Sequence, residues 1–274
     1  MTPYWSDWRH RLPFYIPKGI PVSIPSLEKN FKTKFDLVIE FDSSGQYHLI
    51  GKRRLSIPAL MWSIDTHHYD KRAFQAYFQK DFDILYSSNM DHANFFKHTK
   101  FQWLPCACDP DFHRKMNLPK IYDVAFVGSL DPKDYPERVR ILEKLSKKFK
   151  VHTFHKVYRE EMVRILNQAK IVFNKSHSGD INFRIFETLS CGSFLITDRL
   201  NNGLQDLFQD GKHLAMYDNL GELEDKVSYY LTHDEEREQI ASTGQKEVRD
   251  KHTFYHRAKT MLDDAERLKQ TYCR

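Results

Sequence analysis

Short apolar runs alternate with longer amphipathic stretches along the first part of the chain. The runs are rich in β-forming residues and end in polar or turn residues, which predicts strands. These strands lie at 35–41, 57–64, 83–87 and 101–104. Residues 70–78 and 90–97 read as helices between them. Such an alternation is typical of α/β folds.

The same alternation returns in the second part of the chain. The expected strands are 122–127, 151–154, 171–173 and 193–197. The expected helices are 138–148, 160–168 and 183–190. Cys191 and Gly192 end the last of these, because glycine easily adopts the positive φ of a helix C-terminus. Strand–helix units in both parts predict two largely parallel, doubly wound sheets.

Helical periodicity dominates the C-terminal part. Leu223, Val227, Tyr230 and Leu231 form one apolar stripe. Asp234 is expected to be the N-cap of the next helix, and Thr253 the cap of a final one. The apolar face of the final helix consists of Ala258, Met261, Leu262, Ala265 and Leu268.

Proline interrupts the periodicity between the two parts. Pro105, Pro110 and Pro119 lie in a stretch with little helical or strand pattern, which predicts an interdomain crossing. Two of the four cysteines, Cys106 and Cys108, lie here. Their spacing gives half of a metal site, but no second pair completes it, so we expect ordinary thiols.

Composition narrows the class of protein. With 41% apolar and 29% charged residues, the chain of 274 residues is expected to fold and to be water-soluble. No apolar run approaches the ~20 residues that span a bilayer, and the N-terminus lacks a signal-peptide pattern, so a cytoplasmic location is expected. The net charge of +5 favours anionic ligands, but no clustered basic helix predicts nucleic-acid binding.

Polar residues crowd the loop that follows the apolar strand ending at Phe173. They are Asn174, Lys175, Ser176, His177, Ser178, Asp180 and Asn182. The loop leads into a helix N-terminus, and ligands of open α/β sheets bind at this edge, where the helix favours phosphate. Lys175 and Arg184 add positive charge to such a site.

Glu187 follows Arg184 by one helical turn, so the two side chains share a face. A carboxylate at this place can accept hydrogen bonds from two ribose hydroxyls. The alternative is a polar loop with an Arg184–Glu187 surface pair, and the residues alone leave both open.

The pattern Asp180-x-Asn182-x-Arg184-x-x-Glu187, followed by Cys191-Gly192 and Thr197-Asp198, resembles the donor-site signature of group 1 GT-B glycosyltransferases. The resemblance is closest to the spore-maturation (CgeB-like) branch. Other segments that resemble the family are 62–67, 103–110, Phe126-Val127-Gly128-Ser129 with Arg138, Gly211-Lys212-His213 and 252–257. The ordered set covers about residues 55–260.

This resemblance implies a GT-B fold, with two Rossmann-like domains, a cleft between them and a C-terminal helix crossing back. Residues 1–113 would be a reduced acceptor-side domain, 114–252 the donor domain and 253–274 the returning helix. The donor would be a nucleotide diphosphate sugar, used without a metal or cofactor, and the acceptor is open. The donor-binding residues would be Gly128, Ser129, Arg138, Asn174, Lys175, Asp180, Asn182, Arg184 and Glu187. At Gly128, a side chain would hold the phosphate away from the backbone amides.

Two features depart from the family pattern. Many retaining relatives carry a Glu eight positions before the residue matching Glu187, and this chain has Gly179 there, next to Asp180. The region before residue 35 lacks a Gly-rich first βα unit. A non-catalytic nucleotide-sugar-binding module therefore stays open as an alternative, and so does a sugar-nucleotide epimerase, because that class shares the fold.

Asp65 and His67 are the candidates for acceptor chemistry. They follow the expected strand 57–64, where a parallel sheet opens toward a cleft, and either could take a proton from an acceptor hydroxyl or hold the donor sugar. The alternative is that Asp65 caps the next helix and His67 and His68 are exposed. Two Asp-x-Asp motifs, at 81–83 and 109–111, match a metal pattern of other glycosyltransferases, but we expect no required metal. Peripheral contact with a membrane stays open.

Overall fold

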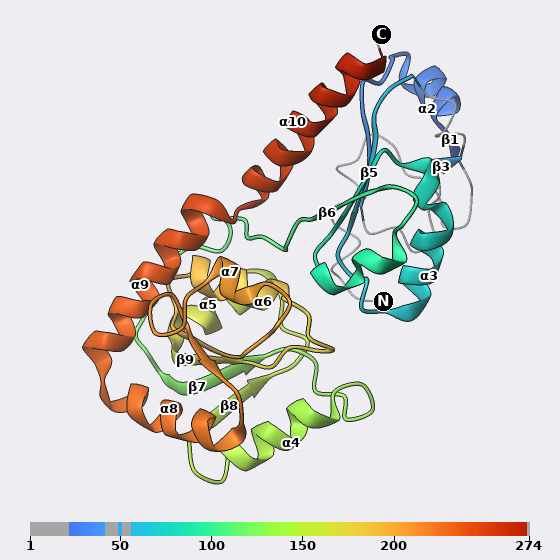
Figure 1. The fold of residues 1–274 in the computed structure, drawn as a ribbon. Helices are drawn as coiled ribbons and strands as arrows, with labels where there is room; N and C mark the ends of the chain where they lie inside the picture. Colours follow the sequence, from blue (N-terminus) through green and yellow to red (C-terminus); the bar gives the residue numbers. More distant parts are fainter. Residues whose placement is uncertain (1–21, 42–48, 51–55, 273–274) are drawn as a thin grey trace. The chain divides into compact units, whose positions relative to one another are not determined.

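The computed structural model describes residues 22–41, 49–50 and 56–272, which divide into two compact units (Figure 1). Unit 1 combines the described residues up to Leu104 with those from Met261 onward, and unit 2 is Pro105–Thr260. The assignment of separate roles to 1–113, 114–252 and 253–274 stays a prediction. Within the described part of the chain, no helix is long and apolar enough to cross a membrane.

Unit 1 is built on a parallel sheet with the strand order β2-β4-β5-β6. The strands are β2 (Val38–Phe41), β4 (Ala59–Ser63), β5 (Ile84–Ser87) and β6 (Lys100–Trp103). Its helices are α2 (Ile24–Phe31), α3 (Tyr69–Phe78) and the 3-10 helices η3 (Gln79–Asp81) and η4 (Met90–Phe95). A small parallel pair joins β1 (Val22–Ser23) to β3 (Leu49–Ile50). The four predicted strands are confirmed, whereas the helix predicted at 90–97 is a shorter 3-10 helix.

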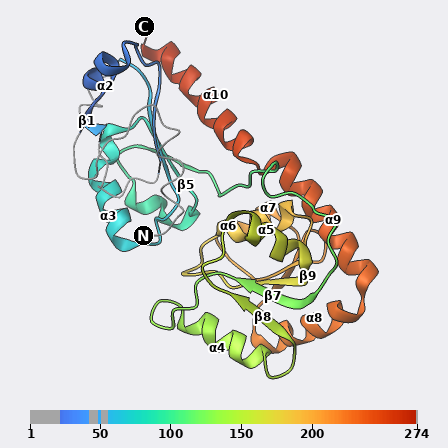
Figure 2. The same cartoon turned by 180° about the vertical axis from the view of Figure 1, so that it is seen from behind.

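Unit 2 holds a second parallel sheet, in the order β11-β10-β9-β7-β8. Its strands are β7 (Tyr122–Val127), β8 (Val151–Phe154), β9 (Ala169–Asn174), β10 (Leu195–Asp198) and β11 (Ala215–Tyr217). Its helices are α4 (Pro136–Leu145), α5 (Arg159–Gln168), α6 (Phe183–Ser190), α7 (Leu204–Leu207), α8 (Leu220–Thr232), α9 (Asp234–Lys251) and the start of α10 (Phe254–Tyr272). Helices α4 and α8 cover one face of the sheet, and α5 and α6 cover the other (Figure 1 and Figure 2).

The core of unit 2 explains why its strands read as apolar runs. Strand β9 lies between β7 and β10 and is covered on both faces, so Ile171, Val172 and Phe173 are all fully buried. On the α4 side, Leu142 and Leu145 pack against the same core cluster. Burial of such side chains stabilises the fold by roughly 1.5–3 kcal/mol each, relative to exposure.

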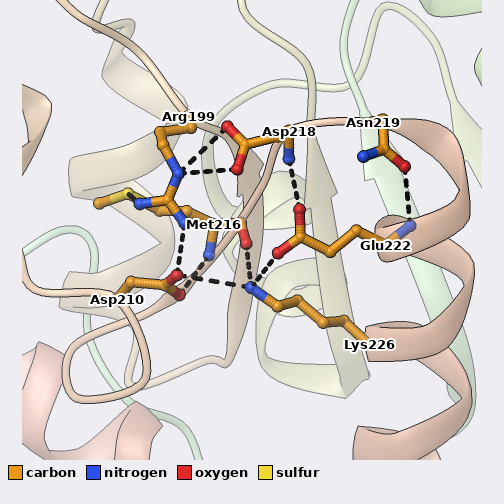
Figure 3. Close-up of polar contacts among 7 residues, drawn as sticks. All are labelled: Arg199, Asp210, Met216, Asp218, Asn219, Glu222 and Lys226. Atoms are coloured by element: carbon orange, nitrogen blue, oxygen red, sulfur yellow. Dashed lines mark hydrogen bonds and ion pairs between the residues drawn. The ribbon is translucent and has the colours of Figure 1, made fainter.

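The outer edge of β11 is closed by charged side chains (Figure 3). The Asp210 carboxylate accepts a 2.8 Å hydrogen bond from the Met216 amide, which lies on this edge strand. Arg199 and Lys226 both pair with the same carboxylate, at 2.7 and 3.4 Å. The network therefore satisfies a donor that an edge strand would otherwise leave unpaired.

The proline-containing stretch after Leu104 is buried and bonded to the C-terminal segment. The Cys108 amide donates to the His252 carbonyl at 3.1 Å, and the Phe254 amide donates to the Cys108 carbonyl at 2.9 Å. Arg257 donates to the carbonyls of Pro105 and Cys106, at 2.7 and 3.0 Å. Two parts of unit 2 that are far apart in sequence are thereby tied together.

The predicted helix caps differ in part. Helix α9 begins at Asp234 itself and its N-cap is His233, so the prediction of Asp234 as cap is wrong by one residue. Thr253 directly precedes α10, and its hydroxyl lies 2.7 Å from Nδ1 of His256 in the first turn. Among the described cysteines, Cys106, Cys108 and Cys191 are free and buried.

Candidate functional site

The carboxyl ends of the five parallel strands meet at one edge of the unit 2 sheet. The loops after β7 and β9 border a cavity of about 440 Å³ at this edge. This is the edge at which doubly wound sheets bind their ligands. The cavity is lined by Lys133, Asp134, Tyr135, Pro136, Glu137, Arg138, Lys175, Ser176, His177, Ser178 and Gly179.

Arg138 connects the two loops that border the cavity. Its guanidinium donates to the Ser129 carbonyl at 3.0 Å and to the Lys175 carbonyl at 2.8 Å. The same group lies over the Tyr135 ring, 4.2 Å from the centroid, and burial lowers its pKa. Its Nε is buried and has no hydrogen-bond partner within the described residues. The guanidinium is thus held in a fixed place in the wall of the cavity.

Lys175 also lines the cavity, but carboxylates compensate its charge. Its ammonium lies 2.9 Å from Asp198 and 3.3 Å from Glu137. Burial lowers the pKa of Lys175, and the two carboxylates raise it by more, so its net pKa is above the usual value. Lys175 therefore stays charged and holds Asp198, which also accepts from the Ser176 amide at 2.9 Å.

The loop after β9 turns through two left-handed residues, Ser178 with φ 51° and Gly179 with φ 75°. A Cβ at Gly179 would meet no atom within 4 Å, so backbone conformation and not space favours glycine here. The Asp180 amide donates to the His177 carbonyl at 3.0 Å, and the Asp180 side chain turns into the protein, where 8% of the residue is exposed.

Asn174 and Asn182 hold the strand ends to α6. The Asn174 amide group donates to the Thr197 hydroxyl at 2.9 Å and accepts from Asn182 at 3.3 Å. Neither asparagine lines the cavity. Their described contacts are with the protein itself, and their predicted contact with the donor stays a prediction.

Arg184 and Glu187 form the expected pair in the first part of α6. Arg184 donates to the Val127 carbonyl at 3.2 Å and to Glu187 Oε2 at 2.8 Å. Glu187 Oε1 lies 3.6 Å from Nε2 of His113. Both side chains of the pair are 17% exposed, so the pair is half-buried and not a simple surface pair.

Gly128 is required by its neighbour in the strand. A Cβ there would lie 2.9 Å from the Phe126 ring, which in turn lies under the Arg138 guanidinium at 5.4 Å. The Gly128 amide donates to the Phe154 carbonyl at 3.0 Å, so this donor is engaged in the sheet.

Asp65 and His67 lie at the carboxyl edge of the unit 1 sheet. Asp65 pairs with Lys71 at 2.5 Å; burial raises the pKa of this carboxyl, and Lys71 lowers it to below the usual value. The N-cap position of α3 is His68 and not Asp65. The His67 and His68 rings lie 4.2 Å apart, and His68 is the exposed one. Because Asp65 is ionised and paired, it is a weak base, and His67 is the stronger candidate.

A polar cluster beside Asp65 was not predicted. The Thr66 hydroxyl lies 2.8 Å from Nδ1 of His92 and accepts from Asn89 at 2.9 Å. Arg72 donates to the Thr66 carbonyl at 3.1 Å and lies 3.2 Å from Nε2 of His92. The signal for this cluster was the run Ser87-Ser88-Asn89 at the end of a strand. Lys133, Tyr135 and His113 were likewise missed in unit 2.

Both Asp-x-Asp motifs have structural partners. Asp83 accepts from the Ala59 amide at 2.8 Å, and Asp109 accepts from the amides of Asp111 and Phe112 at 3.0 and 3.3 Å. In the described part of the chain, no group of three or more His, Cys, Asp or Glu side chains is arranged to hold a metal ion.

The family model described as glycosyl transferase-like matches residues 110–263, more than half of the chain. No curated protein sequence matches the chain significantly.

Similar solved structures are glycosyltransferase-type proteins. Sucrose-phosphate synthase from Thermosynechococcus elongatus has a TM-score of 0.62 at 11% identity, over 90% of this chain and 78% of that one. The Anabaena protein HepE, solved in complex with UDP and glucose, has a TM-score of 0.62 at 12% identity, over 88% and 81%. A glycosyltransferase from Rickettsia africae has a TM-score of 0.61 at 10% identity, over 89% and 79%. At such identities the likeness establishes the fold alone, which is the predicted α/β fold of GT-B type. The family match over residues 110–263 shows the family: the chain belongs to the glycosyl transferase-like family.

Proposed function

We propose that unit 2 binds the nucleoside diphosphate part of a sugar nucleotide, and that the chain transfers the sugar to an acceptor without a metal. The observation that carries this proposal is the cavity of about 440 Å³ beside the Arg138 bridge. Its volume is typical of small-molecule sites, which are about 300–1,000 Å³. Arg138 lines the cavity, and its charge suits an anionic ligand there.

Charge stabilisation follows from these residues. When the bond to the anomeric carbon breaks, negative charge develops on the leaving diphosphate. Arg138 and Lys133 are cations in the cavity wall, and α6 begins at Phe183 shortly after the lining loop ends. Pre-oriented cations and a helix N-terminus stabilise developing charge at little reorganisation cost. Lys175 contributes mainly by fixing the loop, because Asp198 and Glu137 compensate its charge.

Glu187 would accept hydrogen bonds from the ribose hydroxyls. Its carboxylate is held by Arg184 and faces His113, and it keeps 17% of its side chain exposed. On the acceptor side, His67 would take the proton of the attacking hydroxyl, and Asp65, paired with Lys71, would orient this region.

The finer assignment extends the family match. A place nearest the CgeB-like branch is part of the proposal, and the signature between Asp180 and Glu187 supports it. A cytoplasmic location is also part of the proposal. UDP is the first nucleotide to test, because the Anabaena protein was solved with it. The rival functions are a sugar-nucleotide epimerase and a binding module without catalysis. The binding module is a rival because Gly179 stands where many retaining relatives carry a Glu.

Incubation with a panel of sugar nucleotides, with and without candidate acceptors, separates these functions. A transferase releases nucleoside diphosphate and does so faster with the correct acceptor. An epimerase forms product without any acceptor. Binding with neither release of nucleotide nor an epimerised sugar nucleotide under any condition would support the binding module and overturn the proposed transfer.

A further inference from the structure

His113 lies beside the carboxylate assigned to the ribose. It comes from the segment before β7, outside the loop–helix stretch that contains the donor signature. Its Nε2 is 3.6 Å from Glu187 Oε1, while Arg184 holds Oε2 at 2.8 Å. Each carboxylate oxygen of Glu187 therefore faces a different nitrogen.

Three hydrogen bonds fix His113 in this place. Its amide donates to the Asp109 carbonyl at 2.7 Å, and its ring Nδ1 accepts from the Asp109 amide at 3.3 Å. Its carbonyl accepts from the Ser190 hydroxyl at 2.6 Å, and Ser190 ends the same helix that carries Glu187. The ring is thus held relative to α6, and 8% of the residue is exposed.

The ring bonds decide which nitrogen carries the proton. Since Nδ1 accepts a hydrogen bond, the neutral imidazole has its proton on Nε2, which faces Glu187. Burial lowers the pKa of His113, and Glu187 and Asp109 offset this only in part. At neutral pH the ring is therefore neutral, and its Nε2–H faces a carboxylate oxygen 3.6 Å away, slightly beyond hydrogen-bond distance.

We propose that His113 is a positioning residue for the ribose: together with Arg184 it fixes the plane of the Glu187 carboxylate before the nucleotide binds. This inference rests on the proposed function, in which Glu187 accepts the ribose hydroxyls. Residues that contact a ligand-binding side chain can orient it and tune its affinity, as the outer-shell partners of metal ligands do. The segment 109–113 then becomes part of the donor site.

The test compares a ribonucleotide with an analogue that lacks both hydroxyls. Affinities for UDP and 2′,3′-dideoxy-UDP, and for the GDP and ADP pairs, are measured by calorimetry, and the ratio within each pair reports the ribose contacts. His113→Asn keeps an acceptor for the Asp109 amide but does not reach Glu187. The affinity for the ribonucleotide relative to its dideoxy analogue should therefore fall about three- to tenfold. His113→Gln places a donor near the position of Nε2 and should keep the wild-type ratio.

His213 offers a matched control in the same unit. Its Nδ1 accepts from the Gln209 amide at 3.2 Å and its own amide donates to the Gln209 carbonyl at 3.0 Å, which repeats the local geometry of His113. His213→Asn should leave the ribose ratio unchanged. If this variant changed the ratio as much as His113→Asn, the effect would be a general loss of loop structure, and the proposal would be overturned.

Failure of the inference and failure of the proposed function give different results. If Glu187→Ala leaves the ratio unchanged, Glu187 does not bind the ribose. The positioning role is wrong if Glu187→Ala brings the ratio to about one but His113→Asn keeps the wild-type ratio. That second result includes the case in which His113→Asn lowers the affinity for both nucleotides of a pair equally. Should His113→Asn not fold, His113→Gln decides, because loss of the ratio in that variant contradicts the role.

Discussion

The guanidinium of Arg138 donates a 2.8 Å hydrogen bond to the carbonyl oxygen of Lys175. This contact joins α4 to the loop after β9, and a second hydrogen bond of 3.0 Å, to the Ser129 carbonyl, joins the loop after β7 to them. The guanidinium keeps one buried donor, Nε, without a partner in the described part of the chain. Arg138 therefore supports the cavity wall, and we propose that its charge also serves an anionic ligand.

Replacing Arg138 by Met should weaken a nucleoside diphosphate more than the corresponding nucleoside. Loss of a hydrogen bond from a charged group costs about 1.5–3 kcal/mol, or roughly tenfold to a hundredfold in affinity. Calorimetry with UDP and uridine, and with the corresponding guanine and adenine ligands, measures the affinities for the diphosphate and for the nucleoside. Equal weakening of nucleoside and diphosphate would show that Arg138 only holds the loops.

Replacing Lys175 by Met should affect stability more than phosphate binding. The Asp198 carboxylate, whose side chain is 10% exposed, would lose its ammonium partner while staying buried. We expect a loss of about 1–3 kcal/mol in the free energy of unfolding. Urea unfolding measures it, and Lys175→Met with Asp198→Asn should recover much of the loss. No recovery in the double variant would mean that the pair itself contributes little.

The protein should lose stability as the pH falls from about 6.5 to 4, and His252 should account for part of the loss. Burial, followed by the charge of Arg257, lowers the pKa of His252 to about 4. The unfolded chain has a histidine pKa of about 6.5, so between these values it binds more protons than the folded chain and is favoured. The contribution is about 2–3 kcal/mol at its largest.

Unfolding free energies of the wild type and His252→Asn at several pH values measure this contribution. The variant should show a flatter dependence on pH between 4 and 6.5. Because burial also lowers the pKa of His113 and His213, some dependence remains. Parallel curves for the two proteins would contradict the assignment.

Replacing Gly244 by Ala should destabilise unit 2, although alanine is the better helix former. A Cβ at this position of α9 would lie 2.1 Å from the His213 carbonyl oxygen and 2.9 Å from the Leu189 side chain. The gain in helix propensity is about 1 kcal/mol, and overpacking against backbone costs about 1–3 kcal/mol or more. Ser242→Ala, on the exposed face of the same helix, is the matched control. Equal thermal stability of both variants would show that α9 can move away from residue 213.

The sequence predicts the central strands of the two sheets because these strands are buried on both faces. Ile171–Phe173 reads as an apolar run for this reason, and its place in β9 is confirmed. Strand β11, Ala215–Tyr217, is too short to give such a signal and depends on Asp210 at its edge. The cap of α9 is displaced by one residue, because Asp234 fits the first turn as well as the cap.

The site was predictable where its partners are close in sequence. Arg184 and Glu187 are one helical turn apart, and their contact follows from that spacing. His113 reaches Glu187 only through the tertiary fold, so no local pattern indicates it. Arg138 was predicted as a phosphate ligand, but its bridge to the carbonyls of Ser129 and Lys175 depends on two loops meeting in space.

The most direct measurement is a calorimetric titration of nucleoside diphosphates and their sugars into the wild type and Glu187→Ala. If unit 2 is a donor site, at least one nucleoside diphosphate binds with a stoichiometry of about one, and Glu187→Ala weakens it roughly tenfold to a hundredfold while remaining folded. Absence of binding by every nucleotide tested, or equal affinity in the wild type and a folded Glu187→Ala variant, would contradict the donor site as assigned.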